Sequence, residues 1–231
     1  YFERPGTRLA TKVDDGYAAD ITEAVNGSGF TGRFDPAAFS GMQIDGKTYM
    51  VPWSGDVTNV FWYNKAIFTA NGLTPPATWD EFLEVAKFFQ GREIDGHTVY
   101  GAAIFTERAS EGITMGATSL LYPYGFKFEN TPGQYDMEGA VNSADAVKGL
   151  EMYKALYDCC TPPGYTNSYM EENLDAFKSG QVAMMMNWFA FWPGMSKDEN
   201  VGGDKIGFFV NPGEKTAAST LMRRLRPRVR R

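Results

Sequence analysis

The residues best suited to bind a ligand lie in one short segment, between Val51 and Lys65. It contains an indole, a carboxylate and a carboxamide close together, at Trp53, Asp56 and Asn59. An indole packs against the flat C–H face of a sugar ring, while carboxylate and amide groups bond its hydroxyls. The pattern therefore indicates a sugar site. The alternative is structural, with Trp53 filling the core and Asp56 capping a turn.

Catalytic signatures give little support to an enzyme. Neither G-x-S-x-G nor H-E-x-x-H occurs, and His97 is the single histidine. Adjacent carboxylates such as Asp80–Glu81 and Glu171–Glu172 are typical of helix starts. A glycoside hydrolase needs two carboxylates that converge across a cleft, and no pair stands out as such. We expect no catalysis, no cofactor and no metal; a carbohydrate-active hydrolase is the alternative.

The net charge of −6 is unevenly distributed along the chain. Six arginines lie between Arg223 and Arg231, and the rest of the chain holds 16 basic against 28 acidic residues. Because nucleic-acid binding needs a basic face, so acidic a body argues against that function. No run of about 18 apolar residues is present that could cross a membrane.

Cys159 and Cys160 are adjacent and are the two cysteines of the chain. A disulfide between neighbouring residues closes a small, strained ring. We therefore expect two free thiols near a helix end, with a vicinal disulfide or a metal role as the alternatives.

Strands and helices are expected to alternate, which indicates an α/β fold. Thr78-Trp-Asp-Glu81 has the pattern of a capping box and predicts a helix start. Apolar spacing predicts a helix over 143–157, with Val147, Leu150, Tyr153, Ala155 and Leu156 on or beside its buried face. Asp45-Gly46 predicts a hairpin turn. The predicted strands are 59–63, 98–104, 134–136, 181–186 and 205–210, the predicted helices 64–71, 78–89, 114–122, 143–157 and 170–178, and residues 1–20 show no clear period.

The chain contains a set of short motifs in a specific order: Gly46-Lys-Thr-Tyr49, Val51-Pro52, Tyr63-Asn-Lys65, Gly72-Leu73, Thr78-Trp-Asp-Glu81, Val141-Asn-Ser143, Phe177-Lys-Ser-Gly180 and Val182-Ala-Met184. In order and spacing they resemble family 1 of the extracellular solute-binding proteins, the maltose-binding type of periplasmic protein. The resemblance covers residues 17–213. Each motif alone is loose, but the ordered set is specific.

The resemblance implies a periplasmic binding protein-like type II fold, in which two α/β lobes joined by crossing strands close on a ligand. By position, residues 1–56 would be a partial first lobe with the first crossing, and 57–207 a nearly complete second lobe. Residues 208–216 would return to the first lobe. Residues 217–231 do not resemble the family, and we expect a frameshifted or otherwise non-native end. A genuine basic tail that binds anionic partners is the alternative.

The function that the resemblance implies is capture of a sugar or polyol by the solute-binding component of an ABC transporter, which delivers it to the membrane permease. A monomer is expected, in the periplasm or as an extracellular, membrane-anchored lipoprotein. No signal peptide is visible in this chain. A truncated chain that carries half of the cleft and does not function alone is a further alternative.

The resemblance also implies which residues touch the ligand. The family takes an acid or amide from the loop before Tyr63-Asn64-Lys65 and an aromatic side chain from the segment after the strand that follows Gly180. Trp188 is the main candidate for that aromatic, and two residues near the ends of one predicted helix are added. The candidates are Trp53, Asp56, Asn59, Thr114, Tyr122, Asn187 and Trp188.

Overall fold

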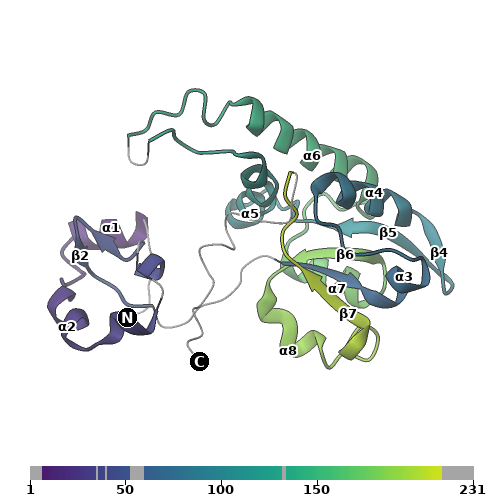
Figure 1. The fold of residues 1–231 in the computed structure, drawn as a ribbon, viewed down its shortest axis with the longest axis horizontal. Coiled ribbons are helices and arrows are strands. Elements are labelled where there is room, and N and C mark those ends of the chain that lie inside the picture. The colour runs from purple at the N-terminus through teal and green to yellow at the C-terminus, as the bar shows by residue number, and fades with distance from the viewer. Residues whose placement is uncertain (1–6, 35, 40, 53–59, 132–133, 215–231) are drawn as a thin grey trace. The chain divides into compact units, whose positions relative to one another are not determined.

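The fold was obtained as a computed structural model. Two compact units are present, one within residues 1–56 and one within residues 57–220 (Figure 1). The predicted Arg-rich end, residues 217–231, lies outside the described residues. The structure describes residues 7–34, 36–39, 41–52, 60–131 and 134–214.

The first unit is small and mostly helical. Its helix Thr7–Asp14 (α1) falls in a polar stretch for which the sequence predicted no element. The expected hairpin is confirmed, because Asp45 and Gly46 both have positive φ and turn β1 back onto β2. The elements are α1, α2 (Thr22–Gly27), η1 (Phe30–Arg33), η2 (Pro36–Phe39), β1 (Gln43–Ile44) and β2 (Lys47–Thr48).

The second unit contains a five-stranded sheet in the order β4-β5-β6-β3-β7. Only β5 and β6 pair in parallel; the other neighbours are antiparallel. The central strand β6 is buried along its whole length, as expected for a strand covered on both faces. The strands are β3 (Val60–Asn64), β4 (Arg92–Ile94), β5 (His97–Ala103), β6 (Val182–Asn187) and β7 (Ile206–Phe209).

Helices cover both faces of this sheet (Figure 1). Phe61 packs against Trp79 and Phe82 of α4, whereas Trp62, which points to the other face, stacks on Trp192 of α8. The predicted capping box is confirmed at Thr78, where α4 begins. The helices are α3 (Lys65–Ala70), α4 (Trp79–Phe89), α5 (Ser110–Leu121), η3 (Tyr122–Tyr124), α6 (Ala144–Cys160), α7 (Met170–Lys178), η4 (Phe189–Phe191), α8 (Trp192–Met195) and η5 (Gly203–Lys205).

The orientation of α6 corrects the sequence prediction. Val147 is 49% exposed and Leu150 is 50% exposed, so they do not form the buried face. The buried row instead contains Ala146, Gly149 and Met152 and continues to Cys160. A Cβ on Gly149 would lie 2.9 Å from the Cα of Leu121, so α5 approaches α6 at the position of the small residues.

Two further expectations are wrong. Cys159 and Cys160 form a disulfide with each other and are not free thiols. Residues 134–136 form no strand, because the loop around them bonds to its own side chains: Asn130 Nδ2 donates to the carbonyls of Asp136 and Glu138. Such local side-chain bonds compete with a strand ladder.

Candidate ligand-binding site

One edge of the large sheet gathers several strand ends. Val60, the first residue of β3, pairs with Asn187, the last residue of β6. Phe61 pairs with Phe209, the last residue of β7, and the parallel strand β5 ends beside Met185. The carboxyl ends of β5, β6 and β7 therefore meet at this edge. In open α/β sheets, ligands bind outside the carboxyl ends of the strands.

Trp188 follows β6 at this edge. Its side chain is half-buried and packs against the main core. The indole Nε1 is shielded from solvent and has no acceptor among the described residues. Trp188 thus places a half-buried aromatic ring at the carboxyl edge, where a hydroxylated ligand could stack on it.

Asn187 is fully buried, and its amide is used inside the protein. Its Oδ1 accepts from the backbone N–H of Trp188 at 2.9 Å, and its Nδ2 donates to the carbonyl of Met170 at 2.9 Å. The side chain therefore fixes the turn after β6 against the start of α7. In this arrangement Asn187 positions Trp188, and its side-chain oxygen and nitrogen both bond within the protein.

The start of α7 also contacts the first half of α5. Tyr169 Oη donates to the Sδ of Met115 at 3.7 Å, and the ring of Tyr169 packs on Phe105, beyond the end of β5. Thr114, the residue before Met115, is exposed. The beginning of α7 thus contacts α5 through Met115, one residue after Thr114.

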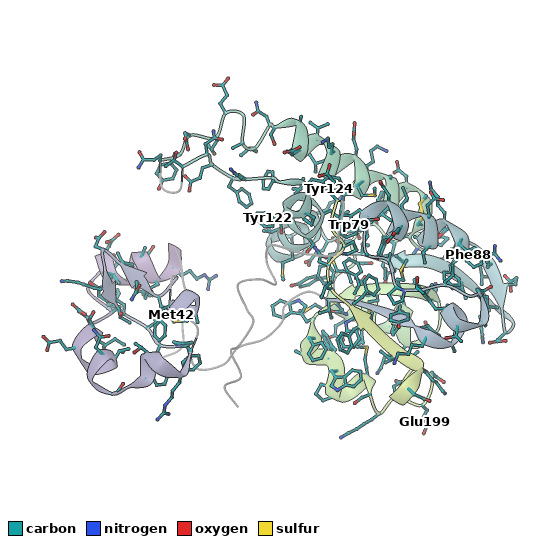
Figure 2. All side chains as sticks on the ribbon, in the orientation of Figure 1. Met42, Trp79, Phe88, Tyr122, Tyr124 and Glu199 are labelled. Atoms are coloured by element: carbon teal, nitrogen blue, oxygen red, sulfur yellow. A yellow bond between two sulfur atoms is a disulfide. The ribbon has the colours of Figure 1, made fainter. Side chains whose placement is uncertain are left out.

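Tyr122 belongs to another group of residues. It lies just beyond α5, next to α6 (Figure 2), with its ring centroid 5.9 Å from that of Phe126 and 6.2 Å from that of Phe128. Eight residues separate it from Thr114, which is about 12 Å along a helix axis. The structure therefore does not bring Tyr122 and Thr114 together.

An aromatic cluster lies on the α8 side of the sheet and includes side chains from the segment after β6. The rings of Trp62, Phe189 and Trp192 are nearly parallel, with centroids 5.5 Å to 6.2 Å apart. Phe208 meets all three edge-on and is 53% exposed. The sequence analysis missed this cluster. Its signal was the position of Trp62 beside Phe61, on opposite faces of one strand, followed by aromatic residues directly after β6.

Ionisable groups near the strand ends have structural partners. Burial raises the pKa of Tyr153 to about 12, and its hydroxyl donates to the carbonyl of Phe105 at 2.7 Å. Burial, with the carboxylates of Asp80 and Glu214, raises the pKa of Tyr124 to about 12.

The described residues hold no group of three or more His, Cys, Asp or Glu that is placed to bind a metal ion. None of the described helices is long and apolar enough to cross a membrane.

Two glycine-rich stretches of the first unit match phosphate-binding patterns in spacing. Gly41–Thr48 reads G-x-x-x-x-G-K-T, and Gly27–Gly32 reads G-x-G-x-x-G. Both signatures require a strand, a glycine loop and a helix in that order. Here Gly41–Thr48 contains the β1–β2 hairpin, and Gly27–Gly32 connects α2 to η1. Neither stretch has the structure of a phosphate loop.

Three predicted contacts, Trp53, Asp56 and Asn59, lie outside the described residues. They stay predictions. Of the others, Asn187 and Trp188 lie at the carboxyl edge, Thr114 lies in the first half of α5 and Tyr122 follows its last residue; all four stay predictions.

Comparisons with known proteins identify the class of this chain. The sequence profile of the family described as bacterial extracellular solute-binding protein matches residues 2–222. A protein of Brucella abortus named as a binding protein is 30% identical over 196 residues, which are 78% of this chain and 42% of the relative. The mannitol-binding protein of Pseudomonas aeruginosa is 25% identical over 185 residues, 78% of this chain and 40% of the relative.

A solved structure shows the same fold. T. maritima MalE3 with bound maltose has a TM-score of 0.73 at 25% identity, over 87% of this chain and 49% of that chain. The predicted α/β fold of the periplasmic binding protein-like type is thereby confirmed. The chain spans about half the length of the relatives it matches. On the match of the family profile to residues 2–222, the chain belongs to the bacterial extracellular solute-binding proteins.

Proposed function

We propose that this protein is the solute-binding component of an ABC transporter and that it binds a sugar or polyol. It takes up the solute outside the cytoplasmic membrane, delivers it to the membrane permease and performs no chemistry on it. The observation that carries this proposal is the family match over residues 2–222. The ligand class is supported by the mannitol-binding relative and by the maltose bound to the similar solved structure.

The proposed site lies at the carboxyl edge of the large sheet. Trp188 would stack on the ligand ring or chain and donate its indole N–H to a hydroxyl, while Asn187 holds it in place. Trp53, Asp56 and Asn59 stay in the proposal because they precede Val60 in the sequence, and Val60 pairs with Asn187. A further proposed contact is Thr114, on the exposed side of α5.

The proposed mechanism is lobe closure around the solute. The ligand stabilises the closed form only by its higher affinity for that form, and the permease recognises it. We propose that the protein acts as a monomer, in the periplasm or anchored to the outer side of the membrane as a lipoprotein.

Calorimetric titration of the chain with D-mannitol and with maltose tests the proposal. Trp188→Ala is expected to weaken binding about tenfold or more, since a stacked aromatic ring contributes about 1 kcal/mol beyond its buried area. Trp188→Phe keeps the ring face and loses the N–H, so it should weaken binding less. Tyr135→Ala, at a side chain that is 83% exposed in a remote loop, is the matched control.

Each outcome of this titration bears on one part of the proposal. Unchanged affinity in Trp188→Ala would show that the site is assigned wrongly. Absence of binding to any sugar or polyol would refute the ligand class. New reducing ends formed from maltose would favour the hydrolase alternative over a binding protein.

A further inference from the structure

At the end of α5, the position that would donate to the carbonyl of Ser119 is occupied by a proline. In an α-helix the carbonyl of residue i accepts from the N–H of residue i+4. For Ser119 that residue is Pro123, which has no N–H. The neighbouring carbonyls have backbone donors: the carbonyl of Thr118 accepts from the N–H of Tyr122, and that of Leu121 accepts from the N–H of Phe126. Ser119 is buried, so its carbonyl is expected to accept from a protein donor and not from water.

Asn211 donates to this carbonyl from a distant part of the chain. Its Nδ2 donates to the carbonyl of Ser119 at 2.5 Å, across 92 positions of sequence. Both residues are buried, at 5% and 6% exposure. The amide orientation is set chemically, because a flipped amide would point Oδ1 at the Ser119 carbonyl, acceptor against acceptor. The Oδ1 is buried and has no partner among the described residues, so the side chain is used for this one bond.

The segment that follows β7 is held on three sides. Beyond Asn211, Pro212 and Gly213 are buried. The N–H of Gly213 donates to the carbonyl of Ala77 at 3.0 Å, and its carbonyl accepts from the N–H of Trp79 at 3.0 Å, at the start of α4. Lys148 Nζ of α6 lies 3.6 Å from a carboxylate oxygen of Glu214. Figure 1 shows this yellow segment running past α4 and α5.

Two other close contacts fix α5 itself. A Cβ on Gly116 would lie 2.6 Å from the carbonyl oxygen of Phe105, and one on Gly149 would lie 2.9 Å from the Cα of Leu121. So close an approach to backbone leaves α5 little freedom to shift alone. A displacement of α5 must be taken up by the elements bonded to it, and Asn211 is the bond to the segment after β7.

We propose that Asn211 is a positioning residue that couples α5 to the segment 211–213. Through this bond, a displacement of α5 on the side that faces the proposed ligand also displaces residues 211–213. The start of α4, which is bonded to Gly213, moves with them. The coupling itself is a property of the second unit. Its role in transport rests on the proposed function, in which α5 lines the site and residues 208–216 return to the first lobe.

Amide hydrogen exchange on the ligand-free chain tests the coupling. Asn211→Leu keeps the volume and removes the N–H, and the amides of Gly213 and Trp79 should then exchange about fivefold faster, the effect of losing one hydrogen bond. Asn173→Leu is the matched control. Asn173 is also fully buried, its Nδ2 donates to the carbonyl of Met186 at 3.0 Å, and its Oδ1 also has no partner among the described residues.

A second substitution separates coupling from mere stability. Pro123→Ala, added to Asn211→Leu, restores a backbone N–H for the Ser119 carbonyl. The double variant should therefore regain denaturant stability, whereas Gly213 and Trp79 should still exchange fast, because the link to α5 is absent. Recovery of slow exchange together with stability would overturn the proposal, as would equal acceleration in Asn173→Leu. Asn211→Ala gives the same comparison if the leucine variant does not fold.

Binding of D-mannitol tests whether the coupling responds to a ligand. In the unmodified chain, saturating mannitol should slow exchange of Gly213 and Trp79, and Asn211→Leu should abolish that slowing while Asn173→Leu retains it. Slowing that persists in Asn211→Leu would overturn the coupling. If the unmodified chain does not bind mannitol, mannitol is not its solute, and the ligand-free comparison alone decides on Asn211.

Discussion

Two leucines on one helix provide a sharp test of the structure. Leu150 and Leu156 both lie on α6, and the sequence pattern placed both on or beside its buried face. In the structure Leu150 is 50% exposed and Leu156 is 1% exposed. Truncation of each to alanine removes the same atoms from the same helix, so helix propensity cancels in the comparison.

The expected magnitudes differ clearly. Leu156 belongs to the main core, and truncation of a fully buried leucine costs about 2–5 kcal/mol, including the cavity that is left. Half of the surface of Leu150 already faces water, and no tightly closed cavity would form there. Its truncation is therefore expected to cost at most about 1 kcal/mol.

Urea denaturation followed by tryptophan fluorescence measures both losses, since Trp62 and Trp79 are buried and report on unfolding. The two variants should share one m-value and differ in midpoint. Equal losses at Leu150 and Leu156 would refute the exposed position of Leu150 in solution. The measurement is repeated at two protein concentrations, because association of two chains through this face would make the Leu150 loss depend on concentration.

Two further predictions follow from α5, α6 and η3. Gly149→Ala should destabilise the chain, because the added Cβ would lie 2.9 Å from the Cα of Leu121; urea denaturation should show the loss, and Gly27→Ala, with open space around it, should not. The pKa of Tyr124 is about 12 in the folded protein, above its usual value, so its contribution to stability is complete below about pH 10 and is lost as pH rises toward 12. The melting temperature should thus fall less steeply above pH 10 in Tyr124→Phe than in the exposed control Tyr135→Phe; identical slopes would contradict the shift.

The sequence predicted those elements whose signals are local. The capping box at Thr78 and Glu81 needs only residues three positions apart, and both of its bonds are present. The Asp45-Gly46 turn has its cause in the two residues that adopt positive φ. At the site, the family motif led to Trp188 because an aromatic residue directly after a buried strand must emerge at the end of that strand.

Errors arose where a distant residue decides the outcome. The periodicity of α6 shows two candidate rows, one with Val147 and Leu150 and one with Ala146 and Gly149. The row with the small residues is buried because α5 comes within backbone contact of Gly149, and no local pattern contains that information. Asn187 stays a predicted contact, and its internal bond could not be read from the sequence, since the acceptor for its amide, the Met170 carbonyl, lies 17 positions earlier.

The bond between Asn211 and Ser119 shows how such distant effects originate in sequence. Pro123 is a local signal, because it ends α5 and removes one donor. The compensating donor lies 92 positions away and belongs to the segment that leaves the sheet. A proline at the end of a helix therefore shifts the hydrogen bond of one carbonyl to another part of the fold. Here the bond reaches the segment that follows β7, so the helix end and that segment are expected to move together.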